Sequence, residues 1–564
     1  MSQKAQNSKL QSRPFHRQPE STYTTPRSRA RPVPPVRMTW ALLILVFFAI
    51  SPLCRAGSPP IWPTCRGASG PFGLGEITFP NTGSPAAQQD FLRGVLLLYT
   101  FEYGDARAAF REAERIEPSF AMAYWGEAMT YDEPIWYEED LDGARAALAK
   151  LAPTAAQRAA KAGTLRQRMY LAAVEQLYGA GTKTQRDARY SAAMRALVHR
   201  FPHDLNARTF YALSLLGLSN GVRNIPNYMR AAAQAEQVLQ IDPCQPGALH
   251  YLIHATDDPL HAVLGLQAAR RLAEVAPASE HAQHMPSHIY MALGMWNRVI
   301  RANLTSIKIA RADHMTGYHQ MMFLIYAYLQ ENKRAQAAKW IRLIAREAAA
   351  NRLSGNGTHG SNTPVTLANL ASGASKDARM RLAYMRAIWL VETHGAPGVH
   401  ARTLVDTRGI PSMLYFATQD FAIGITSAND INAARAALVR LRRLITAGRL
   451  APHGVTTGWL DTVSPQQLHD AQLMADALDG VIQYKEGNRA AGIALLKRTA
   501  AAADRMSYQY GPPWSVEPLD ELLGELLLAD GQRVQAIEAF KKTLAQYPNR
   551  RLALADLAAA QSKH

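Results

Sequence analysis

The chain has 564 residues, with 62 lysines and arginines against 45 aspartates and glutamates, and a net charge of +17. Apolar residues make up 48% and charged residues 19% of the sequence, which excludes a wholly disordered chain and allows a large buried core. Three cysteines in this length exclude a disulfide-rich scaffold and a cysteine-rich zinc module. Alanine is abundant, and proline and glycine fall between segments rather than inside them, which favours helices.

The positive charge is concentrated at the N-terminus, where residues 1–56 hold nine basic side chains and a single acid. The remaining chain has only a modest basic excess. It contains no basic run interleaved with aromatic residues and no glycine-rich loop of the phosphate-binding kind. We therefore expect no nucleic-acid partner.

Residues 40–50 form an uncharged apolar run that follows basic residues and precedes Pro52. Crossing a bilayer takes about 20 apolar residues, so the run fits the apolar part of a secretory signal better than a membrane span. We expect a targeting region over residues 1–56, cleaved after Ala56, and an exported protein that is periplasmic or extracellular. The alternative is an uncleaved anchor at residues 40–50, which would then be the only contact with a membrane.

Residues 57–85 are rich in proline and glycine and are predicted to be a linker. After cleavage at Ala56, two cysteines remain, Cys65 and Cys244. They can pair in an oxidising compartment, but two cysteines this far apart are equally compatible with unpaired thiols.

From about residue 86 the chain repeats one pattern, two helical segments with a tight turn and a closing proline. The clearest copy is a 34-residue unit that begins at Glu517. Its characteristic residues stand at positions 7, 8, 15, 20, 24 and 32: Leu523, Gly524, Gly531, Ala536, Phe540 and Pro548. A second copy, counted from Ala87, ends with Ala106, Phe110, Ala113 and Pro118 at positions 20, 24, 27 and 32. These residues resemble the signature of the tetratricopeptide repeat (TPR).

The resemblance implies an all-α fold, an α-solenoid of helix-turn-helix pairs. Small residues at positions 8 and 20 let the two helices of a pair approach, and the aromatic residue at position 24 fills the gap between repeats. A single pair cannot bury its apolar face alone, so successive pairs stack. The segments 101–110, 121–126 and 293–296 further resemble a bacterial group of large, often exported TPR proteins, a likeness that brings no biochemical activity with it.

The exceptions to the pattern predict the domain organisation. Residues 351–376 are polar and rich in glycine, serine and asparagine, which predicts a long loop. This loop would separate an N-terminal TPR array over residues 86–350 from a C-terminal array over residues 377–564. A polar segment at about 550–562 is predicted to be a capping helix.

Histidines recur in phase with the repeat between residues 243 and 296. His250 and His254 are four residues apart, and His281, His284 and His288 follow at spacings of three and four, so each set shares one helix face. His284 and His288 each follow their counterparts, His250 and His254, by one repeat length. Adjacent repeats therefore carry histidine at the same two positions.

In the TPR family these positions line the concave groove, where peptides bind. His319, at position 2 of the following repeat, continues the row, and Asp257 and Asp258 fall at positions 12 and 13 of the repeat that begins at Pro246. The predicted binding groove therefore consists of eight residues: His250, His254, Asp257, Asp258, His281, His284, His288 and His319.

Three interpretations of the histidines remain open. The first is a polar groove that binds a protein or peptide partner, in an exported scaffold. The second is a transition-metal site for zinc, copper or iron, because imidazole suits these ions; its ligands would be His250, His254, His281, His284 and His288. The third is that the histidines are partly core residues with satisfied ring nitrogens.

An enzyme is compatible only with the second interpretation, through a metal with an open coordination position. The sequence has no His-Glu-x-x-His motif, no nucleophile elbow and no obvious pair of acids. It therefore identifies no catalytic residue. Glu280 and Asp258 are the candidates for a general base, a role that only their geometry can support.

Overall fold

The structure is a computed structural model that describes residue 65 and residues 67–562, apart from residues 314, 351–366, 411–412, 428 and 452–462. The described residues belong to one compact unit, Trp62–His564. The predicted targeting region 1–56 and its alternative anchor at 40–50 lie outside the described residues. Within the part of the chain that is described, no helix combines the length and apolarity needed to cross a membrane.

The described residues form helices joined by short turns, with one two-stranded ribbon, β1 (Asp132–Glu133) and β2 (Glu138–Glu139). The helices before residue 280 are α1 (Pro85–Tyr99), α2 (Tyr103–Ile116), α3 (Ala121–Met129), α4 (Leu141–Leu151), α5 (Ala155–Lys161), α6 (Leu165–Leu177), α7 (Lys183–Arg200), α8 (Leu205–Gly217), α9 (Ile225–Leu239), α10 (Pro246–Thr256) and α11 (Ala262–Val275). The predicted all-α fold class is therefore confirmed.

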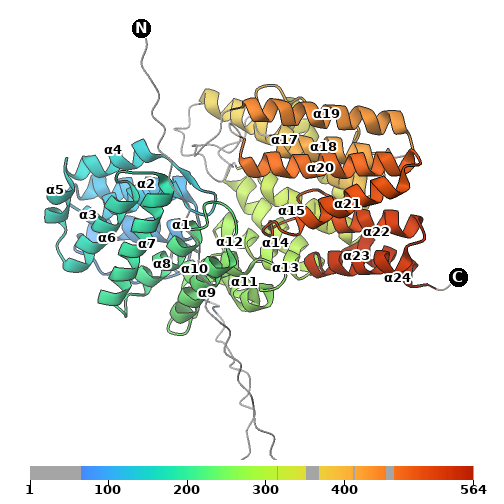
Figure 1. The fold of residues 1–564 in the computed structure, drawn as a ribbon. Helices are drawn as coiled ribbons and strands as arrows, with labels where there is room; N and C mark the ends of the chain where they lie inside the picture. Colours follow the sequence, from blue (N-terminus) through green and yellow to red (C-terminus); the bar gives the residue numbers. More distant parts are fainter. Residues whose placement is uncertain are drawn as a thin grey trace, which may run out of the picture. The chain divides into compact units, whose positions relative to one another are not determined.

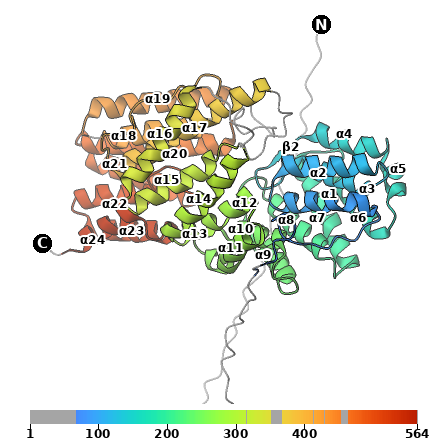
Figure 2. The same cartoon turned by 180° about the vertical axis from the view of Figure 1, so that it is seen from behind.

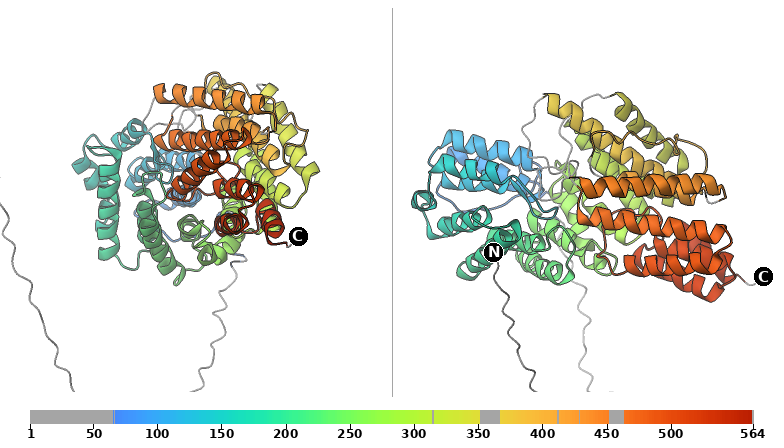
Figure 3. Two further views of the ribbon diagram at one scale, coloured as in Figure 1. Left: turned by 45° about the vertical axis from the view of Figure 1, so that its right-hand side comes forward. Right: turned by 45° about the horizontal axis from the view of Figure 1, so that its top comes forward.

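The helices from residue 280 onward continue the same alternation. They are α12 (Glu280–His284), α13 (Pro286–Ala292), α14 (Trp296–Ala312), α15 (Tyr318–Gln330), α16 (Arg334–Ala350), α17 (Leu367–Glu392), α18 (Leu414–Ile425), α19 (Ile431–Leu450), α20 (Pro465–Lys485), α21 (Arg489–Ala503), α22 (Leu519–Ala529), α23 (Arg533–Gln546) and α24 (Arg551–Gln561). Neighbours in sequence pack against each other as antiparallel pairs, which Figures 1 and 2 show from opposite sides. The red and orange helices α19–α24 lie in stacked layers, also visible in Figure 3.

The TPR signature corresponds to a physical contact within each pair. A Cβ atom added to Gly524 of α22 would lie 2.5 Å from the ring of Phe540 on α23, and one added to Gly94 of α1 would lie 2.7 Å from the ring of Phe110 on α2. In both copies a glycine at position 8 meets an aromatic ring at position 24. Because no side chain fits between them, the two helices pack closely, and the predicted TPR-like pairs are confirmed.

Local sequence explains where several helices begin. Thr154, Thr164 and Thr182 precede α5, α6 and α7, and each side chain accepts a hydrogen bond from the backbone N–H of the glutamine three residues later. The glutamine side chain bonds back to the threonine backbone, so each start is a reciprocal capping box.

Two predicted segments differ from the structure in extent. His281, His284 and His288, which their spacing places on one helix, lie on two helices, α12 and α13. They divide at Met285 because Pro286 has no N–H to continue the helical ladder. The predicted loop 351–376 is shorter than expected, because α17 already begins at Leu367; residues 351–366 lie outside the described part.

The predicted linker 57–85, described from Cys65 onward, packs along the helices as a strap over residues 67–84. The backbone N–H of Ala278 donates to the carbonyl of Gly73 (2.9 Å), and the Asn206 amide donates to the carbonyl of Thr78 (2.8 Å). Proline and glycine thus mark an extended segment that is nevertheless held in place.

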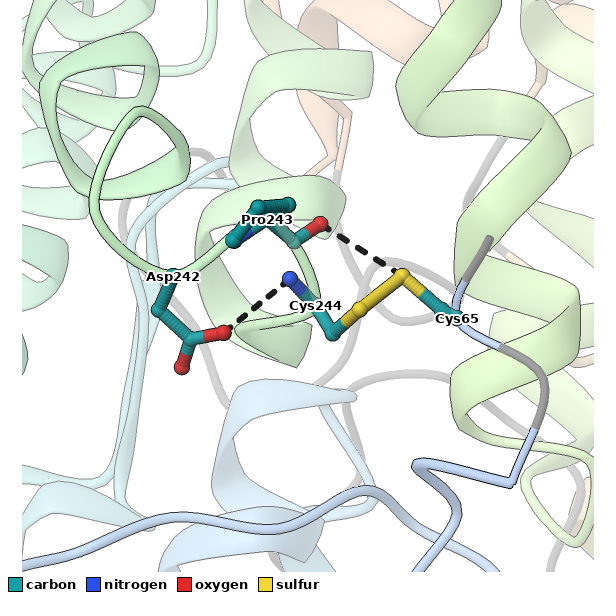
Figure 4. The surroundings of a disulfide bond; sticks show 4 residues. All are labelled: Cys65, Asp242, Pro243 and Cys244. Carbon is teal, nitrogen blue, oxygen red and sulfur yellow. Dashed lines mark hydrogen bonds between the residues drawn. A yellow bond between two sulfur atoms is a disulfide. The ribbon is translucent and has the colours of Figure 1, made fainter. Parts of the chain in front are cut away.

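A disulfide between Cys65 and Cys244 fastens the start of this strap, with Cα atoms 5.6 Å apart (Figure 4). On the other side of the bridge, the Asp242 carboxylate accepts a hydrogen bond from the backbone N–H of Cys244 (3.1 Å). The bond links residues 179 positions apart and therefore closes a loop that contains α1–α9.

We predict that Cys244→Ser lowers the thermal unfolding midpoint relative to the oxidised wild type, because an open loop of this length gains entropy on unfolding. The loss is expected to be about 2–5 kcal/mol in stability. The measurement is thermal unfolding followed by circular dichroism. As a control, wild type treated with reductant should shift to the same midpoint as the variant. Equal midpoints for oxidised and reduced wild type would show that the bridge contributes nothing.

Candidate functional site

The structure brings the six predicted groove histidines together between α10, α12, α13 and α15. They form two groups, in each of which one nitrogen per ring lies within 4.8 Å of the others. The first trio is His250, His254 and His281, and all three are buried. The second trio is His284, His288 and His319, of which only His319 is half-buried rather than buried. The two trios adjoin, with the rings of His254 and His288 5.9 Å apart.

In the first trio, α10 and α12 contribute facing rings. The Nδ1–H of His250 donates to the carbonyl oxygen of Tyr99 at the end of α1 (2.6 Å), since a carbonyl can only accept. A neutral His250 therefore keeps its lone pair on Nε2, and this atom lies 3.1 Å from Nε2 of His281. The tautomer of His250 is thus fixed by the backbone of a different helix.

In the second trio, both helices α12 and α13 contribute rings that are oriented in the same way. The amide nitrogen of Asn303 donates to the carbonyl of Val299, so its oxygen faces His284 and accepts from Nδ1–H (2.7 Å). The Nδ1–H of His288 donates to the Asp257 carboxylate (2.9 Å). The two Nε2 atoms then face each other across 3.1 Å, with each lone pair directed at the other ring.

Facing lone pairs on two nitrogens repel unless a proton or a cation lies between them. Two nitrogen ligands of one ion, each at about 2.0–2.1 Å from it, lie roughly 2.9–3.4 Å apart. The nitrogen pairs in both trios have this separation. Metal-bound histidines also typically donate the other ring N–H to a carbonyl or carboxylate, as His250 and His288 do.

His254 completes the first trio, one helical turn after His250. Its Nε2 is buried and has no hydrogen-bond partner within the described residues. Burial lowers the pKa of His254 well below its usual value, and the neighbouring His250 and His288 lower it further. This ring is therefore a neutral imidazole, the form that binds metals.

The predicted carboxylates support the cluster from outside. Asp257 accepts from His288 and forms an ion pair with Arg223, and Asp258 pairs with Arg223 (3.2 Å) and with Nδ1 of His261 (2.8 Å). Both acids are buried at the end of α10. Asp257 orients a cluster histidine, whereas Asp258 binds only groups outside the two trios.

Glu280 lies at the start of α12 and is directed away from the imidazoles. Its carboxylate accepts from Ser306 (3.3 Å) and from the amide of Gln320. Burial raises its pKa to about 7, although both hydrogen bonds oppose this shift. The Asp258 side chain contacts Arg223 and His261. Within the described residues, neither Glu280 nor Asp258 forms a side-chain hydrogen bond to a ring of the two trios.

Aromatic rings enclose both trios. The ring of Phe101 lies 4.4 Å from that of His250, and the ring of Phe323 lies 4.7 Å from that of His284. Tyr510 stacks on His288 at 4.8 Å, and its hydroxyl accepts from the indole N–H of Trp136 (3.0 Å). The cluster is therefore surrounded by apolar surface, which strengthens electrostatic interactions inside it.

Tyr510 belongs to the connection between α21 and α22, residues 504–518, which crosses to the histidine helices. The Tyr384 hydroxyl is held by the carbonyls of Pro512 (3.1 Å) and Pro513 (2.8 Å), and the Ser507 hydroxyl donates to the carbonyl of Arg223. The 504–518 connection therefore lies against the histidine helices, on the side where a peptide would bind if the groove were open.

The sequence did not single out the residues that orient and cover the histidines. These are Tyr99, Phe101, Trp136, Arg223, Asn303, Phe323, Arg381 and Tyr510; Arg381 donates to Nδ1 of His319 at 3.4 Å. Their only sequence signal is weak, since each is an ordinary helix-packing or loop residue by type. Asn303 is the exception, because an asparagine in the buried middle of a helix such as α14 is unusual.

No protein-family model matches the sequence, and no curated protein matches it. Among solved structures, yeast Tom70 is similar over 84% of this chain and 96% of its own, with 12% identity and a TM-score of 0.33. The Cut9–Hcn1 hetero-tetramer of APC/C is similar over 86% and 79%, with 11% identity and a TM-score of 0.32. The TPR domain of P58(IPK) is similar over 84% and 97%, with 10% identity and a TM-score of 0.21.

We predict that Tyr510→Ala exposes the second trio and raises the rate at which diethyl pyrocarbonate modifies His288. In the wild type, His288 should react far more slowly than the exposed His199 and His203, because burial shields its ring. Peptide mass spectrometry measures the modification site by site. Tyr508→Ala, on the same connection, is the matched control. Wild-type His288 reacting as fast as His203 would contradict the enclosed site.

Proposed function

We propose that this chain is a transition-metal-binding protein of TPR-like helix pairs, in which the two histidine trios provide the ligands. The observation that carries the proposal is the pair of Nε2 atoms of His284 and His288, 3.1 Å apart, with both Nδ1–H groups already donated elsewhere. The same separation, 3.1 Å, recurs between Nε2 of His250 and Nε2 of His281, and the Nδ1–H of His250 is donated to Tyr99.

A proton shared by each nitrogen pair is the competing explanation, and burial disfavours it. An imidazolium ion is costly in a desolvated site, and the lowered pKa of His254 reflects this cost. A cation bound to several neutral imidazoles shares its charge with them. Zinc, copper and iron all accept imidazole ligands, so the donor set defines a class of ion rather than one element.

We also propose that the protein works in an oxidising compartment, as an exported protein would. The Cys65–Cys244 disulfide supports this assignment, because such bridges persist outside reducing cytosol. The signal-like segment in residues 1–56 points in the same direction. An exported protein meets metals without the competition of cytosolic thiols.

Metal analysis of the purified chain tests the function directly. We predict that the wild type, purified without chelators and offered Zn²⁺ or Co²⁺, retains metal through dialysis, and that His284→Ala and His250→Ala each lower the bound amount. Each substitution removes one ligand from a different trio. Elemental analysis gives the metal content, and Co²⁺ gives a visible ligand-field spectrum.

His199→Ala and His203→Ala are the matched controls, because both histidines are exposed and lie outside the trios. They should leave the metal content unchanged. A wild type that retains no Zn²⁺, Co²⁺, Cu²⁺ or Ni²⁺ would defeat the proposal, as would equal losses in the control variants.

We predict that Asp257→Asn weakens metal affinity by roughly 10- to 100-fold, the usual effect of removing a carboxylate that orients a ligating histidine. Asp258→Asn is the control, because it removes the same charge beside Arg223 without touching a trio. Competition with a chromophoric chelator measures both affinities. A similar loss in the two variants would mean that Asp257 acts only through its pairing with Arg223.

A protein-interaction scaffold is the second candidate function, as the TPR resemblance implies. A specific feature favours it: Leu260, Val263 and Leu264 expose 83%, 64% and 52% of their surface on one turn at the start of α11. Apolar side chains grouped in this way commonly mark contact surfaces. A chain that binds no metal would make this candidate the leading one, with its partner on an outer surface rather than at residues 250–319.

A further inference from the structure

The last helices carry a second cluster of ionisable groups, far from the histidines in sequence and different in chemistry. Glu521 and Glu525 are one turn apart on α22, and Asp556 lies on α24, which packs against α22. One carboxylate oxygen from each of the three lies within 4.8 Å of the others. Glu521 is fully buried, and Glu525 and Asp556 are partly exposed.

Positive charge in contact with this cluster is scarce. The Arg550 guanidinium, itself fully buried, donates from Nε to Glu521 (2.6 Å), but it also pairs with Glu392 and donates to the Tyr326 hydroxyl (3.0 Å). Its charge is therefore divided between two carboxylates. Glu525 and Asp556 form no ion pair among the described residues. The other charged groups that face the cluster at longer range are Glu517, Lys485, His394 and Arg551.

Several carboxylate oxygens here are buried and have no hydrogen-bond partner in the described part of the chain. They are Oε1 of Glu521, Oε1 of Glu517 and Oδ2 of Asp556. The second oxygen of Glu521 is already bonded to Arg550, so Oε1 is left for another ligand. A buried carboxylate oxygen without a donor is costly, and three such oxygens near one another need neutralisation.

The pKa values of these carboxylates are shifted in the direction expected from this shortage of positive charge. Burial, together with the neighbouring Glu521 and Asp556, raises the pKa of Glu525 to about 8. Burial raises the pKa of Glu521 to about 7, although Arg550 opposes the shift. These directions agree with the geometry, in which buried carboxylate oxygens lack a hydrogen-bond donor.

We propose that Glu521, Glu525 and Asp556 bind a hard divalent cation, Ca²⁺ or Mg²⁺, that ties the last helix α24 to α22. The donors are all carboxylate oxygens, the ligands that these ions prefer, whereas the histidine trios offer nitrogen to softer ions. Water can complete the coordination shell at the partly exposed side of Glu525 and Asp556. This site is independent of the proposed function.

The test uses the full chain, stripped with a chelator and dialysed, with Ca²⁺ or Mg²⁺ added at up to about 10 mM. At pH 8 we expect one of these ions to raise the thermal unfolding midpoint and to slow amide hydrogen exchange in α22 and α24. Comparison of the two titrations decides between Ca²⁺ and Mg²⁺.

Glu525→Gln and Asp556→Asn should each weaken the binding by about tenfold or more, whereas Glu538→Gln, on the exposed side of α23, should leave it unchanged. Isothermal titration calorimetry measures these affinities, and circular dichroism confirms that each variant folds. The proposal is overturned if neither ion stabilises the wild type at pH 8, or if the two variants respond to the ions as the wild type does. If instead Glu525→Gln and Asp556→Asn raise the unfolding midpoint with no cation added, while the ions have no effect on the wild type, the carboxylates share protons rather than a cation.

Discussion

The two histidine trios depend on the packing of α10 against α13, with α12 next to α13. Equivalent turns of these helices are one repeat length apart, so imidazoles of adjacent repeats meet across the interface: Nε2 of His250 faces Nε2 of His281, and the rings of His254 and His288 lie 5.9 Å apart. Their orientation then comes from three different parts of the chain. Tyr99 on α1, Asn303 on α14 and Asp257 at the end of α10 each accept an Nδ1–H, and together they direct the Nε2 atoms toward one another.

Much of this arrangement follows from sequence periodicity. The repeat positions of Gly94, Phe110, Gly524 and Phe540 predict the close approach of each helix pair, and the spacing of the histidines predicts that they share one face. Both depend on local or repeat-length relations, which a pattern can reveal. The start of α10 at Pro246 follows in the same way, because proline is favourable in the first helical turn.

Other features depend on contacts between residues that are distant in sequence, and no periodicity encodes them. Trp136 and Tyr510, which cover the histidines together, are 374 positions apart. Their side chains are of ordinary types, and the Tyr510 connection has the glycine and proline content of any turn. The break between α12 and α13 could have been predicted from Pro286, since proline removes a backbone donor. The repeat pattern on both sides of it nevertheless favours one continuous helix.

The cover over the histidines comes from residues 504–518, close to the end of the chain, while the rings themselves come from its middle. Without this connection the histidines would lack the Tyr510 ring that stacks on His288. Tyr510 joins distant parts of the chain, because it stacks on His288 and accepts a hydrogen bond from Trp136. Any ion bound at the histidines would therefore enter or leave only when the 504–518 connection moves away from His288.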